Sequence, residues 1–361
     1  MNGYTITGIQ QIGIGVKDLK EAWNWYIKMF GMDCRIFEEE AEANLMLPYT
    51  GNQPRKRHAV LAVNLQGGSG FEVWQYKERE PLMIKEEIRL GDIGILGCKI
   101  KVRDAAKAYS FYKEKGTAIL NEPSSDPSGN KTFFMKDPYG NLFQITEGNN
   151  WFMNENKISG GPCGAIVGVT DTEKARKLYS DILGYDEVVY DRTDIFPDLT
   201  GVNGGKEMIR RVLLKSSKPF TGPFSRIFGP GKIELISNPN NPGKKTYEGR
   251  FWGDPGFIHL CFDIKGMDFL RSYCMEKGFP FTVDSMEKHK GNSFDMGEAA
   301  GHFAYIEDPD GNLIEFVETH KLPVIKKLGW YLDLRKRKPK PLPAWILKML
   351  RFSRVRRDLV T

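Results

Sequence analysis

Hydrophobic residues gather in short runs along this chain, and the pattern changes from strand-like to helix-like four times. The runs at residues 9–16, 96–102, 165–169 and 257–264 are rich in apolar and β-branched side chains, which is typical of buried strands. Each run precedes a stretch that the sequence favours as a helix. The pattern therefore predicts a strand followed by a helix, used four times.

A tyrosine and a glycine mark a similar place in each predicted helix. The four pairs are Tyr26 and Gly31, Tyr112 and Gly116, Tyr179 and Gly184, and Tyr273 and Gly278. A glycine there suits the left-handed residue that ends many helices. At the opposite end, Asp18, Asp104 and Asp171 can each cap a helix. These shared positions indicate one unit repeated four times.

The phrase Asp-Pro-x-Gly-Asn-Leu occurs twice, at residues 137–142 and 308–313. Proline fixes φ and glycine accepts a positive φ, so the phrase predicts a tight turn. Strand-like residues flank the first copy at 131–135 and 142–146, and the second at 303–306 and 313–317. Each copy therefore predicts a hairpin, but the strand after the first carries Gln144 where the strand after the second carries Glu315.

The repeated unit resembles the vicinal oxygen chelate superfamily, which includes glyoxalase I, extradiol dioxygenases and bleomycin-resistance proteins. Residues 10–18 (Gln-Gln-Ile-Gly-Ile-Gly-Val-Lys-Asp) and 308–315 carry the resemblance most specifically. It implies an α+β fold of four βαβββ modules in two glyoxalase-like domains with curved mixed sheets. We expect domain 1 (modules 1 and 2) at residues 6–148, domain 2 (modules 3 and 4) at 160–322, and a basic C-terminal tail at 323–361.

The resemblance also implies a metal between two modules, with ligands from the first and fourth strand of each. Counting back from the helix tyrosines places the first-strand positions at Gln11, Gly97, Gly164 and His259. The corresponding fourth-strand positions are Glu72, Gln144, Glu234 and Glu315. A carboxylate between apolar neighbours on a strand is unusual, because buried charges are seldom left unpaired.

Two ways of pairing the modules give different ligand sets. Pairing the first with the fourth collects Gln11, Glu72, His259 and Glu315, which is the combination that glyoxalase I uses. Pairing the third with the fourth, as in extradiol dioxygenases, gives Glu234, His259 and Glu315. We favour the first arrangement, and His259 and Glu315 belong to both.

One imidazole, one amide and two carboxylates suit a single divalent ion of Zn, Ni, Co, Mn or Fe. Such an ion can hold two adjacent oxygens of a small substrate and polarise its carbonyl group. Glu315 is then the candidate base, with Glu72 a second candidate on the opposite side. Tyr305 is a weaker candidate for the substrate pocket. These residues predict a glyoxalase-like lyase or isomerase.

Two other functions compete with this interpretation. A non-catalytic small-molecule-binding protein, like the bleomycin-sequestering relatives, would tolerate the glycines at positions 97 and 164. An extradiol-type dioxygenase would need a second histidine ligand, which neither position supplies. Glutathione is disfavoured as a co-substrate, because Gly15 stands where glyoxalase I carries an arginine.

Charge and cysteine content restrict partners and compartment. Residues 326–361 hold 12 Lys and Arg against 2 Asp, so the basic character of the chain, +6 overall, belongs to the tail. This distribution argues against nucleic-acid binding by the globular part. Five cysteines without a CxxC pair, and no secretory signal pattern, favour a reduced, cytoplasmic protein. We expect a monomer or a homodimer.

The tail itself predicts a short amphipathic helix at residues 345–355. Trp345, Met349, Phe352 and Arg356 recur at helical spacing, and Lys348, Arg351 and Arg354 lie between them. Such a helix could bind an anionic membrane surface as a peripheral contact. An equally acceptable interpretation packs it against the domain with its charges in solvent.

Overall fold

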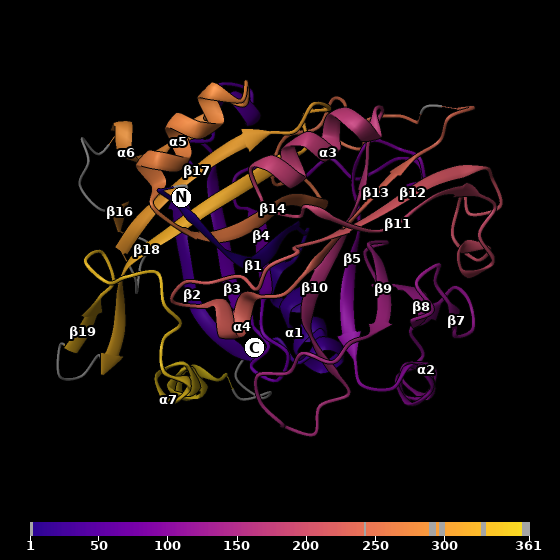
Figure 1. The fold of residues 1–361 in the computed structure, drawn as a ribbon, viewed down its shortest axis with the longest axis horizontal. Coiled ribbons are helices and arrows are strands. Elements are labelled where there is room, and N and C mark those ends of the chain that lie inside the picture. Colours follow the sequence, from indigo (N-terminus) through magenta and orange to yellow (C-terminus); the bar gives the residue numbers. More distant parts are fainter. Residues whose placement is uncertain (1–2, 242, 289–293, 296–299, 326–329, 356–361) are drawn as a thin grey trace.

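The computed structural model describes residues 3–241, 243–288, 294–295, 300–325 and 330–355. Two curved mixed sheets lie side by side (Figure 1), and each takes strands from both halves of the chain. The expected α+β class is confirmed. The domain boundaries drawn from the sequence stay a prediction.

The first sheet has the strand order β15-β17-β18-β14-β1-β4-β3-β2. In the first module its strands are β1 (Thr5–Gly15), β2 (Cys34–Glu42), β3 (Lys56–Val63) and β4 (Gly70–Tyr76). In the fourth they are β14 (Gly256–Lys265), β15 (Val283–Asp284), β17 (Ala300–Glu307) and β18 (Leu313–Ile325). At the edge, β16 (Phe294–Asp295) pairs with β17 and β19 (Trp330–Asp333) pairs with β18. The antiparallel pair β1–β14 thus joins the first module to the fourth.

The second sheet has the order β11-β12-β13-β10-β5-β9-β8-β6. The second module supplies β5 (Gly94–Val102), β6 (Ala118–Ile119), β7 (Ser124–Ser125), β8 (Lys131–Lys136) and β9 (Leu142–Glu147). The third supplies β10 (Ser159–Gly168), β11 (Glu187–Asp194), β12 (Ile209–Lys215) and β13 (Lys232–Ser237). Strands β5 and β10 pair antiparallel at its centre, as β1 and β14 do in the first sheet.

The four module helices are α1 (Leu19–Phe30), α2 (Ala105–Glu114), α3 (Thr172–Asp181) and α5 (Met267–Glu276). Asp18, Asp104 and Asp171 accept hydrogen bonds from the first turn of α1, α2 and α3, as the sequence predicted. The glycine near the end of each helix has a positive φ, between 64° and 83°. Shorter helices are α4 (Ser225–Phe228), α6 (Ser285–Lys288) and α7 (Ala344–Lys348), with 3-10 turns at Leu47–Tyr49, Pro197–Leu199 and Met349–Ser353.

The helix tyrosine and the first aspartate of the repeated turn, both marked by the sequence repeat, are hydrogen-bonded to each other. The hydroxyl of Tyr26 on α1 donates a 2.7 Å hydrogen bond to Asp137, the first residue of the first repeated turn. Tyr179 on α3 donates in the same way to Asp308 of the second turn, at 3.3 Å. Both carboxylates are buried, and burial is the largest cause that raises their pKa, for Asp308 to about 6. The helix tyrosine therefore fixes the turn of the neighbouring module.

One large cluster of buried apolar side chains includes residues from both sheets and from all four module helices. Its members include Ile12 on β1, Phe143 on β9 and Phe262 on β14, each buried. Because this core is shared, the two sheets are held side by side rather than as separate folding units.

The tail packs against the body of the protein. Leu347 of α7 is fully buried in a cluster with Phe224 and Phe228. Arg354 pairs with Asp33 and Glu155, both on the globular part. Residues 326–329 and 356–361 of the predicted tail lie outside the described residues.

Two tail aromatics remain at the surface. Trp345 and Phe352 are 58% and 74% exposed. Among the described residues, no helix is long and apolar enough to cross a membrane. Peripheral membrane contact through the tail stays a prediction.

Candidate metal centre

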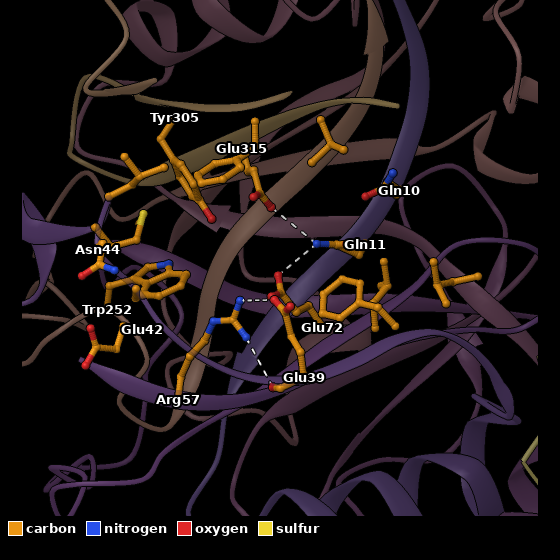
Figure 2. A pocket seen from close by; sticks show the side chains of 18 of the residues that line it. Gln10, Gln11, Glu39, Glu42, Asn44, Arg57, Glu72, Trp252, Tyr305 and Glu315 are labelled. Carbon is orange, nitrogen blue, oxygen red and sulfur yellow. Dashed lines mark hydrogen bonds and ion pairs between the residues drawn. The ribbon is translucent and has the colours of Figure 1, made fainter. Parts of the chain in front are cut away.

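Four side chains meet on one face of the first sheet, and Figure 2 shows three of them, Gln11, Glu72 and Glu315. The four are Gln11 on β1, Glu72 on β4, His259 on β14 and Glu315 on β18. The strand register places them together, because Gly13 of β1 lies opposite both Glu72 and His259. This is the set obtained by pairing the first module with the fourth. The structure thus brings together residues 304 positions apart.

The distances within this set are short. The Nε2 atom of His259 lies 3.4 Å from Glu72 Oε2 and 3.2 Å from Glu315 Oε2. The amide nitrogen of Gln11 donates to Glu72 at 3.0 Å and to Glu315 at 3.4 Å. Glu72, His259 and Glu315 each offer one ligand atom, and these three atoms lie within 4.8 Å of one another. That separation suits donors arranged around one cation.

Burial and mutual charge shift the pKa values of the three titratable groups. Burial raises the pKa of Glu315, and the charge of Glu72 raises it further. For His259, burial alone would lower the pKa, but the charges of Glu315 and Glu72 raise it overall. The pKa of Glu72 is lowered, because the nearby His259 outweighs the effect of burial. The three groups are therefore electrostatically coupled, and the two carboxylates share one imidazole.

Two buried atoms in the set have no hydrogen-bond partner among the described residues. They are Nε2 of His259 and Oε1 of Gln11. Both are atoms that can donate a lone pair to a metal, and buried polar atoms are rarely left without a partner. Because the amide nitrogen and oxygen of Gln11 exchange places on rotation, its oxygen can also be turned toward the carboxylates. The residues present therefore fit one divalent cation.

Gly13 keeps the imidazole of His259 in position, a role that the sequence reasoning missed. A Cβ atom on Gly13 would lie 2.5 Å from Cε1 and 2.6 Å from Nε2 of that ring. Any other residue at position 13 would therefore push the ring away. On its other side the ring stacks on Trp252, with centroids 6.1 Å apart.

A cavity of about 320 Å³ opens over this set. Apolar walls come from Phe37, Trp252, Phe303 and Tyr305, and Arg57 lies at one side, paired with Glu39 (Figure 2). Tyr305 is buried, and its hydroxyl lies 3.4 Å from Nδ1 of His259, so this weaker candidate does reach the cavity. Trp252 and Arg57 were missed, because loop 246–254 and the face of β3 give no motif.

Glu234, the alternative partner of His259, lies elsewhere. Its strand, β13, belongs to the second sheet, where it pairs with β10 and β12. The alternative set of Glu234, His259 and Glu315 is therefore wrong as a spatial group. The reason is that β14 continues the sheet of β1, not that of β10.

Gly15 is also explained by its surroundings. A Cβ atom there would lie 2.2 Å from the carbonyl oxygen of Asp254. No side chain can occupy this place without moving the loop that carries Trp252. An arginine at position 15 is therefore incompatible with this backbone.

Comparison with known proteins agrees with this architecture. The sequence model of the Glyoxalase/Bleomycin resistance protein/Dioxygenase superfamily matches residues 8–145 and 165–316. The structure is similar to glyoxalase I from Zea mays (TM-score 0.53, 15% identity, 86% of this chain and 92% of that one). It is also similar to a protein from Bacillus subtilis described as a putative dioxygenase (TM-score 0.54, 14% identity, 98% and 97%). No curated protein matches the sequence.

Proposed function

Because this chain belongs to the Glyoxalase/Bleomycin resistance protein/Dioxygenase superfamily, we propose that it is a divalent-metal-dependent, glyoxalase-like lyase or isomerase. Its substrate is a small molecule bound through two adjacent oxygens. The observation that carries the proposal is the meeting of Gln11, Glu72, His259 and Glu315. Nε2 of His259 lies 3.4 and 3.2 Å from the two carboxylates, and Oε1 of Gln11 has no hydrogen-bond partner among the described residues. The ion is Zn, Ni, Co, Mn or Fe, all of which accept this donor set.

The bound ion would supply Lewis-acid polarisation of a substrate carbonyl. The protein residues supply the rest. Glu315 accepts the proton from the carbon beside that carbonyl, since its carboxylate lies beside His259 and lines the cavity. Glu72 is the second carboxylate, placed to return a proton from another side. Gln11 is the orienting ligand, since its amide group lies within hydrogen-bond distance of both carboxylates.

The cavity indicates the size and character of the substrate. About 320 Å³ accommodates a small organic molecule, and the walls are mainly aromatic. Tyr305 and Trp252 exclude water beside His259, which strengthens the electrostatic interactions in the site. Gly15 argues against a glutathione conjugate, because the arginine expected for its carboxylate cannot be placed there.

Metal analysis tests the first half of this proposal. Purified protein is dialysed against each divalent ion and then against metal-free buffer, and its metal content is measured by mass spectrometry. We expect one ion per chain in the wild type and less than about a tenth of that in His259→Ala, because a central ligand is missing. Lys244→Met, an exposed change far from the site, serves as the control. Absence of stoichiometric metal in the wild type would favour the non-catalytic binding protein.

Proton exchange tests the second half. The metal-loaded protein is incubated in D₂O with small α-hydroxyketones and α-hydroxyaldehydes, and deuterium at the carbon beside the carbonyl is followed by NMR. Exchange above the rate of the metal-free protein supports proton abstraction. Oxygen consumption with catechols, measured in parallel, would instead indicate the dioxygenase.

A further inference from the structure

The second sheet carries a lysine where the first has its ligand set. Lys99 lies opposite Gln144 on β9 and Gly164 on β10. Its ammonium group donates to the side-chain oxygen of Gln144 and, at 2.5 Å, to Glu234. A Cβ atom on Gly164 would lie 3.0 Å from Cδ of Lys99, so the glycine leaves room for the lysine. The ammonium group thus replaces the cation that the first sheet requires.

The carboxylate of Glu234 is neutralised within the protein. It accepts hydrogen bonds from Arg211 at 2.6 Å and from Tyr190 at 2.7 Å. Arg211 in turn binds Asp198 at 2.8 Å, and all these side chains are buried. Two cations and two carboxylates balance each other here. Glu234 and Asp198 are consequently not available to neutralise other lysines and arginines nearby.

A cavity of about 590 Å³ is lined by residues of β5, β10 and β13, among others. Its basic residues are Lys99, Lys101, Arg103, Lys215 and Lys232, and its acidic residues are Asp126 and Glu147. The two carboxylates already accept backbone hydrogen bonds, from residues 128 and 130 and from residue 105. Lys99 and Lys215 are paired with Glu234 and Glu187, so Lys101, Arg103 and Lys232 are the cations of the lining that remain to be compensated.

Lys101 is a buried lysine of this lining that forms no ion pair with the described residues. It is only 4% exposed, yet no carboxylate among the described residues lies within ion-pair distance of it. Its ammonium group donates to the carbonyl oxygen of Asn150 at 2.9 Å. Burial lowers its pKa to about 8, so it still carries its charge at neutral pH. Buried charges are normally paired, which points to an anion supplied from outside the chain.

Two further cations of the lining form no ion pair with a carboxylate of the described residues. Arg103 stacks over the ring of Trp151, 4.1 Å from its centroid. Lys232, at the start of β13, is half-buried and forms no ion pair within the described chain. Lys232 and Lys101 act on the same space, since both lower the pKa of the Cys163 thiol, and Arg103 lines the same cavity.

We propose that this cavity binds a small organic anion with two negative charges, carried by phosphate or carboxylate groups. Lys101 and Lys232 contact those groups, and Arg103 lies at the entrance. The site is separate from the metal centre, because it lies on the other sheet and contains none of its residues.

Isothermal titration calorimetry at low ionic strength tests the proposal. The titrants are sn-glycerol 3-phosphate, succinate and, as the uncharged control, glycerol. We expect one anion per chain with a dissociation constant below about 1 mM, and no binding of glycerol. A preference for one anion identifies the acidic group. Lys101→Met and Lys232→Gln are each expected to weaken binding by about tenfold, since each removes a charge-assisted contact.

Lys101→Met conserves the length of the side chain, and Lys232→Gln changes a half-exposed residue, so a folding failure in one leaves the other to decide. Lys244→Met, an exposed lysine paired with Glu86, is the matched control and should keep the wild-type affinity. The metal content of both cavity variants should equal that of the wild type, which separates this site from the metal centre. Failure of both anions to bind, or equal weakening in the control, would overturn the proposal.

Discussion

The two sheets have the same strand register but neutralise their central carboxylates in opposite ways. Glu72 of the first sheet and Glu234 of the second hold equivalent places on β4 and β13. Around Glu72 lie Gln11, His259 and a second carboxylate, Glu315, and no lysine or arginine lies within ion-pair distance of that carboxylate in the described chain. Around Glu234 lie Lys99 and Arg211. We therefore propose that the first centre binds an external cation, whereas the second contains its own.

At one pair of facing positions the large and the small residue lie on opposite strands in the two sheets. In the first sheet the small residue is Gly13, which lies opposite the imidazole of His259. In the second the small residue is Gly97, which lies opposite Ile166. Ligand sites can thus be gained or lost on an unchanged backbone when a large and a small residue exchange strands.

The largest effect is expected when Glu315 loses its ability to accept a proton. Glu315→Gln keeps the size and an oxygen ligand but removes the base, so we expect deuterium exchange to fall about 10²- to 10⁴-fold. Gln144→Asn, at the equivalent place of the second sheet, should leave the rate within about twofold of the wild type, because that sheet takes no part in the reaction. Exchange rates and metal content are measured on the same samples. Full turnover by Glu315→Gln would show that another residue is the base.

The next largest effect concerns stability and the second sheet. Glu234→Gln leaves Lys99 and Arg211 buried with one carboxylate fewer, which is expected to cost about 3–5 kcal/mol of the free energy of unfolding. Urea unfolding followed by tryptophan fluorescence measures this difference.

The pH dependence of that difference follows from the sign of the pKa shift. The pKa of Glu234 is lowered in the folded protein despite burial, because Arg211 and Lys99 stabilise its charge. Its contribution is therefore fully present above the unfolded pKa, about 4.3, and is lost as the pH falls below it. The wild type and Glu234→Gln should consequently converge in stability on acidification, and a constant difference down to low pH would contradict the ion-pair account.

A smaller effect is expected from Gly13→Ala. The added Cβ would displace the ring of His259, so metal affinity should fall about 10- to 100-fold while the fold is kept. Gly97→Ala in the second sheet is the matched control, because a Cβ there meets its nearest neighbour at 3.3 Å and no ligand is involved. Competition with a fluorescent chelator gives both affinities. Equal affinities for the two variants would show that Gly13 does not position the imidazole.

Much of the fold was predictable because its signals are local. Caps such as Asp18 and turns such as Asp137–Pro138–Gly140 depend on neighbouring residues alone. Each strand–helix pattern is weak by itself, but its recurrence in four modules made the prediction firm. The register of Gln11 and His259 followed from the same repeat. The compensation of Glu234 by Lys99 and Arg211 could not be found, because it depends on contacts 23 and 135 residues apart.

The smallest effect, and the sharpest test of the comparison, is expected from Glu72→Gln in the metal-free protein. Without a cation, Glu72 and Glu315 share one imidazole, and the charge of Glu72 contributes to the raised pKa of Glu315. Removing that charge relieves the repulsion and loses the attraction to His259, so the free energy of unfolding should change by no more than about 1 kcal/mol. The equivalent change in the second sheet, Glu234→Gln, should cost several times more. Added metal should then stabilise the wild type more than Glu72→Gln, because stabilisation by a ligand follows its affinity. A loss in metal-free Glu72→Gln as large as that in Glu234→Gln would mean that the first centre, like the second, is neutralised by its own residues.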